Sequence, residues 1–464
     1  MRRLFGTDGI RGVANQFPMT AEIAVRLGQA VAHHFRHRAG RRRTRILVGK
    51  DTRLSGYFFE SALAAGLTSM GADVLFLGPL PTPGISFMTT SLRADAGIVI
   101  SASHNPYQDN GIKIFGADGF KLPDEVELEL ESMILAGDPR SGADIEQGGN
   151  PLTALLDAER IGRARRYEDS AGRYVVFMKS AFPKDMTLDG LKIVVDCANG
   201  AAYKVAPLAL EELGAEIVML GNQPNGTNIN RDCGSLHPRF AAAKVIETGA
   251  DLGITLDGDA DRVILIDEKG QLVDGDHIMA LCGPALKAQG ALPHDTVVAT
   301  VMSNIGLEIA LRRHGISLTR TQVGDRYVVG ELRRSGATFG GEQSGHLIFL
   351  DHVSTGDGMV AALQVLSIMQ RTGKPLSELC KVMESFPQTL LNLNVRDKPD
   401  LNTLKEVKVA IEDAEGVLGQ QGRVLVRYSG TEAKVRVMVE GVDSKMTDTC
   451  ARQIADAIER AIGV

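Results

Sequence analysis

The sequence predicts an α/β protein in which three related α/β units precede a smaller C-terminal α+β unit. Short apolar, β-branched segments alternate with stretches of helical period, which is the pattern of βαβ units. This pattern occurs three times, near residues 45–77, 192–220 and 296–318. The second strand of each unit follows a glycine placed to end the preceding helix: Gly71, Gly214 and Gly315. Mostly parallel sheets covered by helices are therefore expected.

The elements of the three units follow from this pattern in chain order. The expected strands are 45–48 and 73–77, then 192–196 and 216–220, then 296–300 and 316–318. A helix joins each pair, the first near 58–70 and the second ending at Leu213. A further apolar strand at 98–100 runs into a loop of small polar residues.

The C-terminal part has a different pattern. Apolar residues alternate at Leu391, Leu393 and Val395, as in a half-buried strand, and a helix is expected after Asp400. Two more strands are expected at 423–427 and 434–440. The last helix carries one apolar stripe: Met446, Cys450, Ile454, Ile458 and Ile462. The 464 residues fit three or four domains, with predicted boundaries 1–153, 154–265, 266–372 and 373–464.

The composition narrows the class of protein. The chain is 44% hydrophobic and 23% charged, as in globular proteins, and its net charge of −6 and lack of tryptophan argue against nucleic-acid binding. The cysteines lie far apart without metal-ligand spacing, which indicates reduced thiols: Cys197, Cys233, Cys282, Cys380 and Cys450. Neither a secretory signal nor a run of about 18 apolar residues occurs, so we expect a cytoplasmic protein without a membrane partner.

The first segment with chemical character is Ser101-Ala-Ser-His-Asn-Pro106, which follows the buried strand at 98–100. Open α/β sheets bind ligands at the carboxyl ends of their strands, so these hydroxyls and the imidazole are candidates for a site. A polar turn that satisfies its own backbone is the alternative. Ser101 lies nearer the strand end than Ser103, and the local pattern does not choose between these two nucleophiles.

The second segment is Asp257-Gly-Asp-Ala-Asp-Arg262, which places carboxylates at alternate positions between two apolar runs. Crowded carboxylates repel one another unless a cation joins them, and hard oxygen ligands suit Mg²⁺ or Ca²⁺. An EF-hand would need glycine where Arg262 stands, although Glu268 fits its last position. A solvated turn is the remaining alternative.

Two further segments have the residue types of a ligand site. Glycines in 340–346 would let the backbone approach a ligand, while Glu342, Ser344 and His346 would supply polar groups for sugar hydroxyls and proton transfer. The loop after the strand at 423–427 has the composition of a phosphate-binding nest: Arg427, Ser429, Gly430, Thr431 and, on the next strand, Arg436. Ordinary turns of the same composition are the alternative in both places.

Together the four segments resemble the α-D-phosphohexomutase superfamily. Its members carry a phosphoserine loop, a DGDxDR metal loop, a GExSGH sugar loop and an RxSGTEP phosphate loop, in the order found here. Ala433 stands where the family usually has proline. Three further segments match the family: 5–12, 49–53 and 110–113. Residues 5–12, Gln343 and residues 323–328 are similar in particular to the branch of the family that acts on amino-sugar phosphates.

The resemblance implies four domains around a central cleft: three related mixed-sheet α/β domains and a C-terminal α+β domain. It implies a homodimeric isomerase that interconverts glucosamine 6-phosphate and glucosamine 1-phosphate, supplying UDP-N-acetylglucosamine and cell-wall synthesis. A phosphomannomutase or phosphoglucomutase is an alternative, because specificity depends on sugar contacts that spacing does not show. A non-catalytic protein that binds a sugar phosphate or calcium is a second alternative. Such a protein would need no nucleophile, so the candidate serine argues against it.

The same resemblance assigns roles to residues. Ser103 would carry the transferred phosphoryl group, and one Mg²⁺ would be bound by a phosphoserine oxygen together with Asp257, Asp259 and Asp261. A hexose 1,6-bisphosphate would be the intermediate and activator. The residues implied in catalysis are Ser103, His346, Lys113 and Arg11, with Arg262 as a further cation. Those implied in substrate binding are Glu342, Ser344, Arg427, Ser429, Gly430, Thr431 and Arg436.

Overall fold

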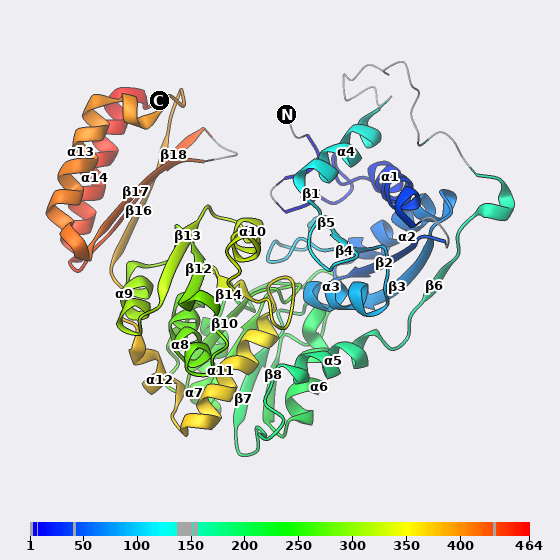
Figure 1. Ribbon diagram of the computed structural model, residues 1–464, viewed down its shortest axis with the longest axis horizontal. Helices are drawn as coiled ribbons and strands as arrows, with labels where there is room; N and C mark the ends of the chain where they lie inside the picture. Colours follow the sequence, from blue (N-terminus) through cyan, green and yellow to red (C-terminus); the bar gives the residue numbers. More distant parts are fainter. Residues whose placement is uncertain (1–2, 7, 40–42, 137–151, 153–155, 430–432) are drawn as a thin grey trace.

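The computed structural model describes residues 3–6, 8–39, 43–136, 152, 156–429 and 433–464. Four domains follow one another along an arc, with the N-terminal domain (blue) and the C-terminal domain (orange and red) at its two ends (Figure 1). Among the helices within these ranges, none has the length and apolar character needed to cross a bilayer.

The N-terminal domain contains a six-stranded sheet in the order β1-β5-β4-β2-β3-β6. Its strands are β1 (Ile10–Val13), β2 (Arg45–Lys50), β3 (Asp73–Pro79), β4 (Ala96–Ile100), β5 (Asp109–Gly116) and β6 (Ala164–Arg166). Its helices are α1 (Ala21–Ala39), α2 (Ser55–Ser69), α3 (Thr82–Ser91) and α4 (Asp124–Leu135). Strand residues alternate between two cores: Ile46 and Val48 pack in a cluster with residues of α1 and α2, whereas Leu47 packs in one with residues of α3.

The second domain contains a five-stranded sheet in the order β11-β10-β9-β7-β8. Its strands are β7 (Lys192–Asp196), β8 (Glu216–Leu220), β9 (Leu252–Leu256), β10 (Val263–Asp267) and β11 (Leu272–Val273). Its helices are α5 (Ser170–Ser180), α6 (Val205–Glu212) and α7 (Arg239–Thr248).

The third domain contains a four-stranded sheet in the order β13-β12-β14-β15. Its strands are β12 (Thr296–Thr300), β13 (Ser317–Thr321), β14 (Phe339–Gly341) and β15 (Leu347–Phe349). Its helices are α8 (Gly275–Ala288), α9 (Ile305–Arg313), α10 (Asp325–Ser335), α11 (Gly358–Thr372) and the short α12 (Leu376–Leu379).

The three α/β sheets share one topology, as the repeated βαβ pattern predicts. In each sheet a central strand has a parallel neighbour on both sides, and the strand after the third one returns antiparallel. The glycines expected to end the first helix of each unit have positive φ: Gly71 (87°), Gly214 (103°) and Gly315 (65°). The prediction of three related α/β domains with mixed sheets is confirmed.

The C-terminal domain has its own hydrophobic core. Its three-stranded antiparallel sheet has the order β16-β18-β17 and consists of β16 (Gln388–Asn394), β17 (Arg423–Tyr428) and β18 (Lys434–Glu440). Its helices are α13 (Lys405–Leu418) and α14 (Ser444–Ile462). Val407, Val437 and Ile454 belong to a core cluster confined to this domain, whereas one cluster runs through the three α/β domains.

A buried carboxyl lies where the third domain meets the segment leading to β16. Asp276 is fully buried, and one of its oxygens accepts a hydrogen bond from the Asn304 amide at 2.8 Å. The Asn304 side chain in turn bonds the backbone of Phe386 on that segment. Burial, followed by repulsion from Asp274, raises the pKa of Asp276 to about 7.

Because the folded pKa of Asp276 lies above its unfolded value, its contribution to stability is lost as pH rises from about 4 through 7. We therefore expect Asp276→Asn, which stays neutral, to stabilise the protein progressively over this range, by an amount on the order of 3–4 kcal/mol at pH 8. Thermal melting of both proteins at several pH values measures the difference. A difference in stability between the wild type and Asp276→Asn that does not vary with pH would contradict the raised pKa of Asp276.

Candidate active site

Three of the four predicted segments occupy the same position in their respective sheets. The segment 101–108 joins β4 to β5, 257–262 joins β9 to β10, and 342–346 joins β14 to β15. Each is the turn between the third strand of the shared topology and its antiparallel return. The fold thus presents three loops with different chemistry from one repeated backbone position.

The loops from the first two domains meet at Ser103. This side chain is buried, and its hydroxyl donates to Asp257 Oδ2 at 2.5 Å. Its backbone is left-handed, with φ of 52°, which side-chain-bearing residues seldom adopt. Of the two serines in the segment, it is therefore Ser103 that faces the carboxylates, while Ser101 Oγ donates to Asp51 at 2.6 Å.

The three carboxylates of the second loop form one buried cluster. Asp257, Asp259 and Asp261 are at most 4% exposed, and one oxygen of each lies within 4.8 Å of the others. Burial, followed by repulsion from the other two, raises the pKa of Asp257 well above its usual range.

These residues fit a hard divalent cation. Within the described structure, Asp259 Oδ1 and Asp261 Oδ1 are buried without a hydrogen-bond partner, as expected for atoms that would ligate a cation. Carboxylate oxygens are the ligands that Mg²⁺ prefers, and the three aspartates with a phosphate on Ser103 would hold it. The cation would neutralise charge on a transferring phosphoryl group.

Cations of the first domain border the cluster. Lys113 Nζ lies 3.1 Å from Asp259, 3.4 Å from Asp261 and 3.2 Å from Asp8. Burial alone would lower the pKa of Lys113, but these carboxylates outweigh it and raise that pKa far above its usual range. Arg11 forms an ion pair with Asp8. Lys113 therefore brings a positive charge to the carboxylate cluster.

His346 faces the same cluster from the third domain. Its Nδ1 lies 3.7 Å from Asp261, its Nε2 lies 3.7 Å from Asp325, and the Gly356 amide donates to Nε2 at 3.2 Å. Burial lowers the pKa of His346, but Asp261 and Asp325 outweigh it and raise that pKa. A cation bound to Asp261 would offset part of this increase.

Glu342 and Ser344 of the same loop lie together. Ser344 Oγ donates to one carboxylate oxygen of Glu342 at 3.2 Å, and the Gly324 amide donates to the other at 3.0 Å. Gly324 precedes Asp325 at the start of α10, so this loop and that helix end form one polar surface. Such a surface offers acceptors and a hydroxyl to a sugar.

The fourth predicted segment stands on the C-terminal domain. Arg427 and Arg436 are opposite each other in the β17–β18 register. Burial, followed by repulsion from Arg436, lowers the pKa of Arg427, as expected for two like charges that an anion would stabilise. Ser429 is buried, and its backbone N–H donates to Lys434 O at 2.8 Å. Gly430 and Thr431 lie outside the described residues.

The structure gives specific partners to His104, which the sequence placed in a candidate site without a particular role, and adds Lys121, to which sequence reasoning gave no role. His104 Nδ1 lies 3.4 Å from Ser103 Oγ, and burial together with Arg262 and Arg11 lowers its pKa to about 4, so this imidazole is neutral at pH 7. Lys121 forms ion pairs with both Asp8 and Asp325, which links the first and third domains. The available signal for His104 was its position next to Ser103, whereas the partners of Lys121 are far apart in sequence.

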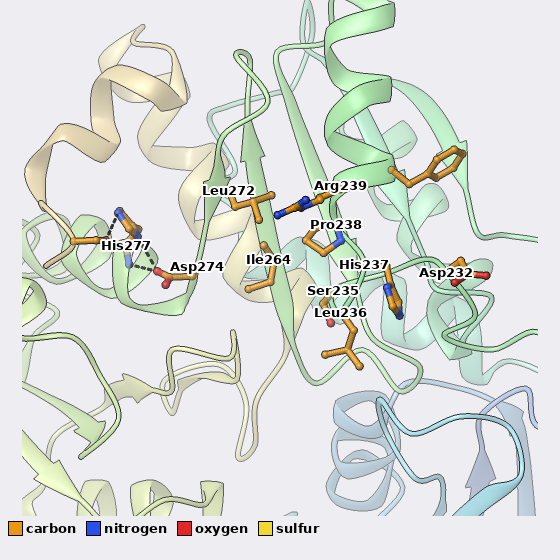
Figure 2. Close-up of a pocket in the computed structure, with 12 residues that line it drawn as sticks. Asp232, Ser235, Leu236, His237, Pro238, Arg239, Ile264, Leu272, Asp274 and His277 are labelled. Atoms are coloured by element: carbon orange, nitrogen blue, oxygen red, sulfur yellow. Dashed lines mark hydrogen bonds and ion pairs between the residues drawn. The ribbon is translucent and has the colours of Figure 1, made fainter. Parts of the chain in front are cut away.

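A pocket of about 800 Å³ lies elsewhere, between the start of α7, the β10–β11 hairpin and the start of α8 (Figure 2). Leu236, Ile264 and Leu272 contribute apolar surface to it, and His277 on its margin hydrogen-bonds Asp274 at 2.7 Å. Its lining includes none of the predicted site residues. This pocket is therefore separate from the polar groups that surround Ser103.

Comparison with known proteins agrees with this organisation. Four family models described as phosphoglucomutase/phosphomannomutase match the chain: alpha/beta/alpha domain I at 2–141, domain II at 172–270, domain III at 274–386 and the C-terminal domain at 390–457. The chain belongs to the phosphoglucomutase/phosphomannomutase family, a class of isomerases that move a phosphoryl group within a sugar phosphate.

Curated relatives carry a more specific name. The phosphoglucosamine mutase of Syntrophotalea carbinolica is 59% identical over all of this chain and 98% of its own length. That of Anaeromyxobacter dehalogenans is 60% identical, with both chains fully covered. A phosphoglucomutase/phosphomannomutase family protein from Burkholderia thailandensis superposes with a TM-score of 0.79 at 25% identity, covering 99% of each chain. The fold also matches Aspergillus fumigatus N-acetylphosphoglucosamine mutase in complex with GlcNAc-6P and magnesium, with a TM-score of 0.67 at 18% identity, covering 100% of this chain and 96% of that one.

The carboxylate cluster predicts that the stability of the protein depends on divalent cations. Adding Mg²⁺ to metal-free protein should raise the melting temperature, with a gain of about 2.7 kcal/mol at a hundred times the dissociation constant. Asp259→Asn should abolish most of this gain, because it removes a charged ligand. Asp274→Asn, outside the cluster, is the control. An equal Mg²⁺ response in both variants would exclude the assigned site.

Proposed function

We propose that this protein is a phosphoglucosamine mutase, which interconverts glucosamine 6-phosphate and glucosamine 1-phosphate through phosphorylated Ser103. The observation that carries the proposal is the buried Ser103 hydroxyl 2.5 Å from Asp257, within a cluster fit for Mg²⁺. The high identity of full-length relatives with this name supports the choice of amino sugar over glucose or mannose. The product would supply UDP-N-acetylglucosamine and cell-wall synthesis.

In this proposal phosphorylated Ser103 gives its phosphoryl group to the free hydroxyl of the sugar phosphate. The P–Oγ bond breaks as the new P–O bond forms, the hydroxyl loses a proton, and Ser103 gains one. The resulting bisphosphate turns over and returns its other phosphate to Ser103. Mg²⁺, one per chain, would neutralise charge during both transfers. The C-terminal Arg427 would bind the phosphate that is not reacting, in either orientation.

The charges in the site suggest how the proton transfers are divided. Lys113, which lies among carboxylates, would stabilise negative charge together with Arg11. His346, whose Nδ1 lies 3.7 Å from Asp261 and whose Nε2 accepts a hydrogen bond from the Gly356 amide, would exchange a proton with the attacking hydroxyl. The neutral His104 is close enough to Ser103 to exchange a proton with it.

We also propose that the protein is cytoplasmic and forms a homodimer. Light scattering in solution tests the oligomeric state.

The central test is a mutase assay on glucosamine, glucose and mannose phosphates with Mg²⁺ and a trace of hexose 1,6-bisphosphate. We expect kcat/KM for the glucosamine phosphate to exceed the others by at least about tenfold. Ser103→Ala should lose turnover by about a thousandfold or more, because it removes the phosphoryl acceptor. Intact mass and peptide mapping should place the phosphoryl group on Ser103 rather than Ser101. Absence of turnover on all three sugar phosphates would exclude the proposed function.

A second test concerns the distal phosphate. Arg427→Ala should raise KM by about tenfold to a hundredfold, since it removes a charge-assisted contact, and should change kcat less. Arg460→Ala is the matched control, because Arg460 is an exposed arginine of the same domain that forms a long ion pair with Glu406 at 3.6 Å. An equal KM in the two variants would exclude Arg427 from substrate binding.

A further inference from the structure

The backbone of Ser103 is held on both sides of its Cα. Its N–H donates to Ser101 Oγ at 2.9 Å, and that hydroxyl donates to the fully buried Asp51 at 2.6 Å. Its carbonyl accepts hydrogen bonds from Arg53 and Asn230. Because φ of 52° is unfavourable for a residue with a side chain, these contacts are needed to keep Ser103 in this conformation. The conformation directs its hydroxyl at Asp257.

Two donors from different domains meet on the same pair of carbonyl groups. Arg53 of the first domain donates to Ser103 O at 3.2 Å and to Asn105 O at 2.5 Å. Asn230 of the second domain donates to both of these oxygens at 2.9 Å. Arg53 is fully buried and forms an ion pair with Asp51. We call Arg53 and Asn230 the carbonyl clamp.

The second-domain half of the clamp belongs to the structure around the metal-binding loop. Asn230 is itself left-handed, with φ of 57°, and its N–H donates to Ala198 O at 2.9 Å. Gly258 of the carboxylate loop packs directly on the clamped carbonyl. A Cβ there would lie 2.6 Å from Ser103 O and 3.0 Å from Asn230 Nδ2, so no side chain fits. The carbonyl clamp and the carboxylate loop therefore hold each other in position.

We propose that Asn230 and Arg53 are positioning residues that hold Ser103 in the left-handed conformation required for phosphoryl transfer. Neither side chain acts on the phosphoryl group, and both act through the loop that carries Ser103. The nucleophile is aligned only when the first two domains are docked, because Asn230 reaches it across their interface. This inference rests on the proposed function, in which Ser103 is the phosphoryl carrier.

The test replaces one donor without changing its shape. Asn230→Asp keeps the size of the side chain but cannot donate to the two carbonyls. Asn228→Asp is the matched control, since Asn228 lies in the same loop and its amide donates to Gln223 O at 3.0 Å, away from Ser103. Arg53→Lys is a second variant, whose single ammonium replaces the planar fork.

Two rates are measured, along with melting temperatures to verify folding. One is the rate at which glucose 1,6-bisphosphate phosphorylates Ser103, followed by intact mass, and the other is steady-state turnover of glucosamine 6-phosphate. For Asn230→Asp and Arg53→Lys we expect phosphorylation and kcat to fall by about tenfold or more with KM within about twofold, because the sugar and distal-phosphate groups are untouched. Asn228→Asp should match the wild type.

The outcomes separate this inference from the proposed function. Phosphorylation of Ser103 in Asn230→Asp at the rate of the Asn228→Asp control would overturn the clamp. A rise in KM without a fall in the phosphorylation rate would also overturn it. If wild-type Ser103 is phosphorylated but glucosamine 6-phosphate is not turned over, the proposed function fails while the phosphorylation rates still decide whether the clamp positions Ser103.

Discussion

The mutual repulsion of three buried carboxylates is the constraint around which the site is built. Asp257, Asp259 and Asp261 lie in one turn whose own cation is Arg262, and one cation does not balance three carboxylates, so further positive charge must come from outside that turn. Lys113 meets this need because β5 returns alongside β4 and pairs Lys113 with Val99, close to the loop that carries Ser103. The second domain therefore depends on the first for charge balance, and docking of the two domains is coupled to the chemistry.

Hydrogen bonds reinforce this docking. Thr82 at the start of α3 bonds both the backbone and the side chain of Asp259, at 3.0 and 2.7 Å. Thr52 bonds Asn199 O at 2.5 Å, and Leu54 bonds Gly226 O at 2.8 Å. One hydrophobic core also runs through the three α/β domains, which carry the loops of Ser103, of the carboxylates and of His346. The C-terminal domain has a separate core and is joined to the third domain by the hydrogen bond from Arg423 to Ser303 O at 3.1 Å.

Local patterns were sufficient to predict much of the fold and to select Ser103 and the aspartate turn, which the structure brings together. Alternating β-branched runs and the glycines before second strands predicted the βαβ units, because both depend on short-range geometry. The aspartate turn was recognisable because repulsion between near neighbours is itself a local property. The role of the clamp residues could not be predicted in this way: Arg53 ends the matching segment 49–53 and Asn230 resembles an ordinary turn residue, but the carbonyl of Ser103 that both contact lies 50 and 127 residues away. The relative roles of Lys113 and His346 likewise depended on which carboxylates surround each one.

The common position of the three loops has a consequence for how such a protein can change. One backbone design, a parallel strand followed by an antiparallel return, serves the nucleophile, the carboxylates and the sugar-facing groups separately. Each task is encoded in a stretch of fewer than ten residues on its own sheet. Under the proposed function, substitutions in the loop between β14 and β15 would alter which sugar is accepted while the loops that carry Ser103 and the carboxylates keep their composition. A division of labour among repeated units lets new specificities arise without rebuilding the reaction.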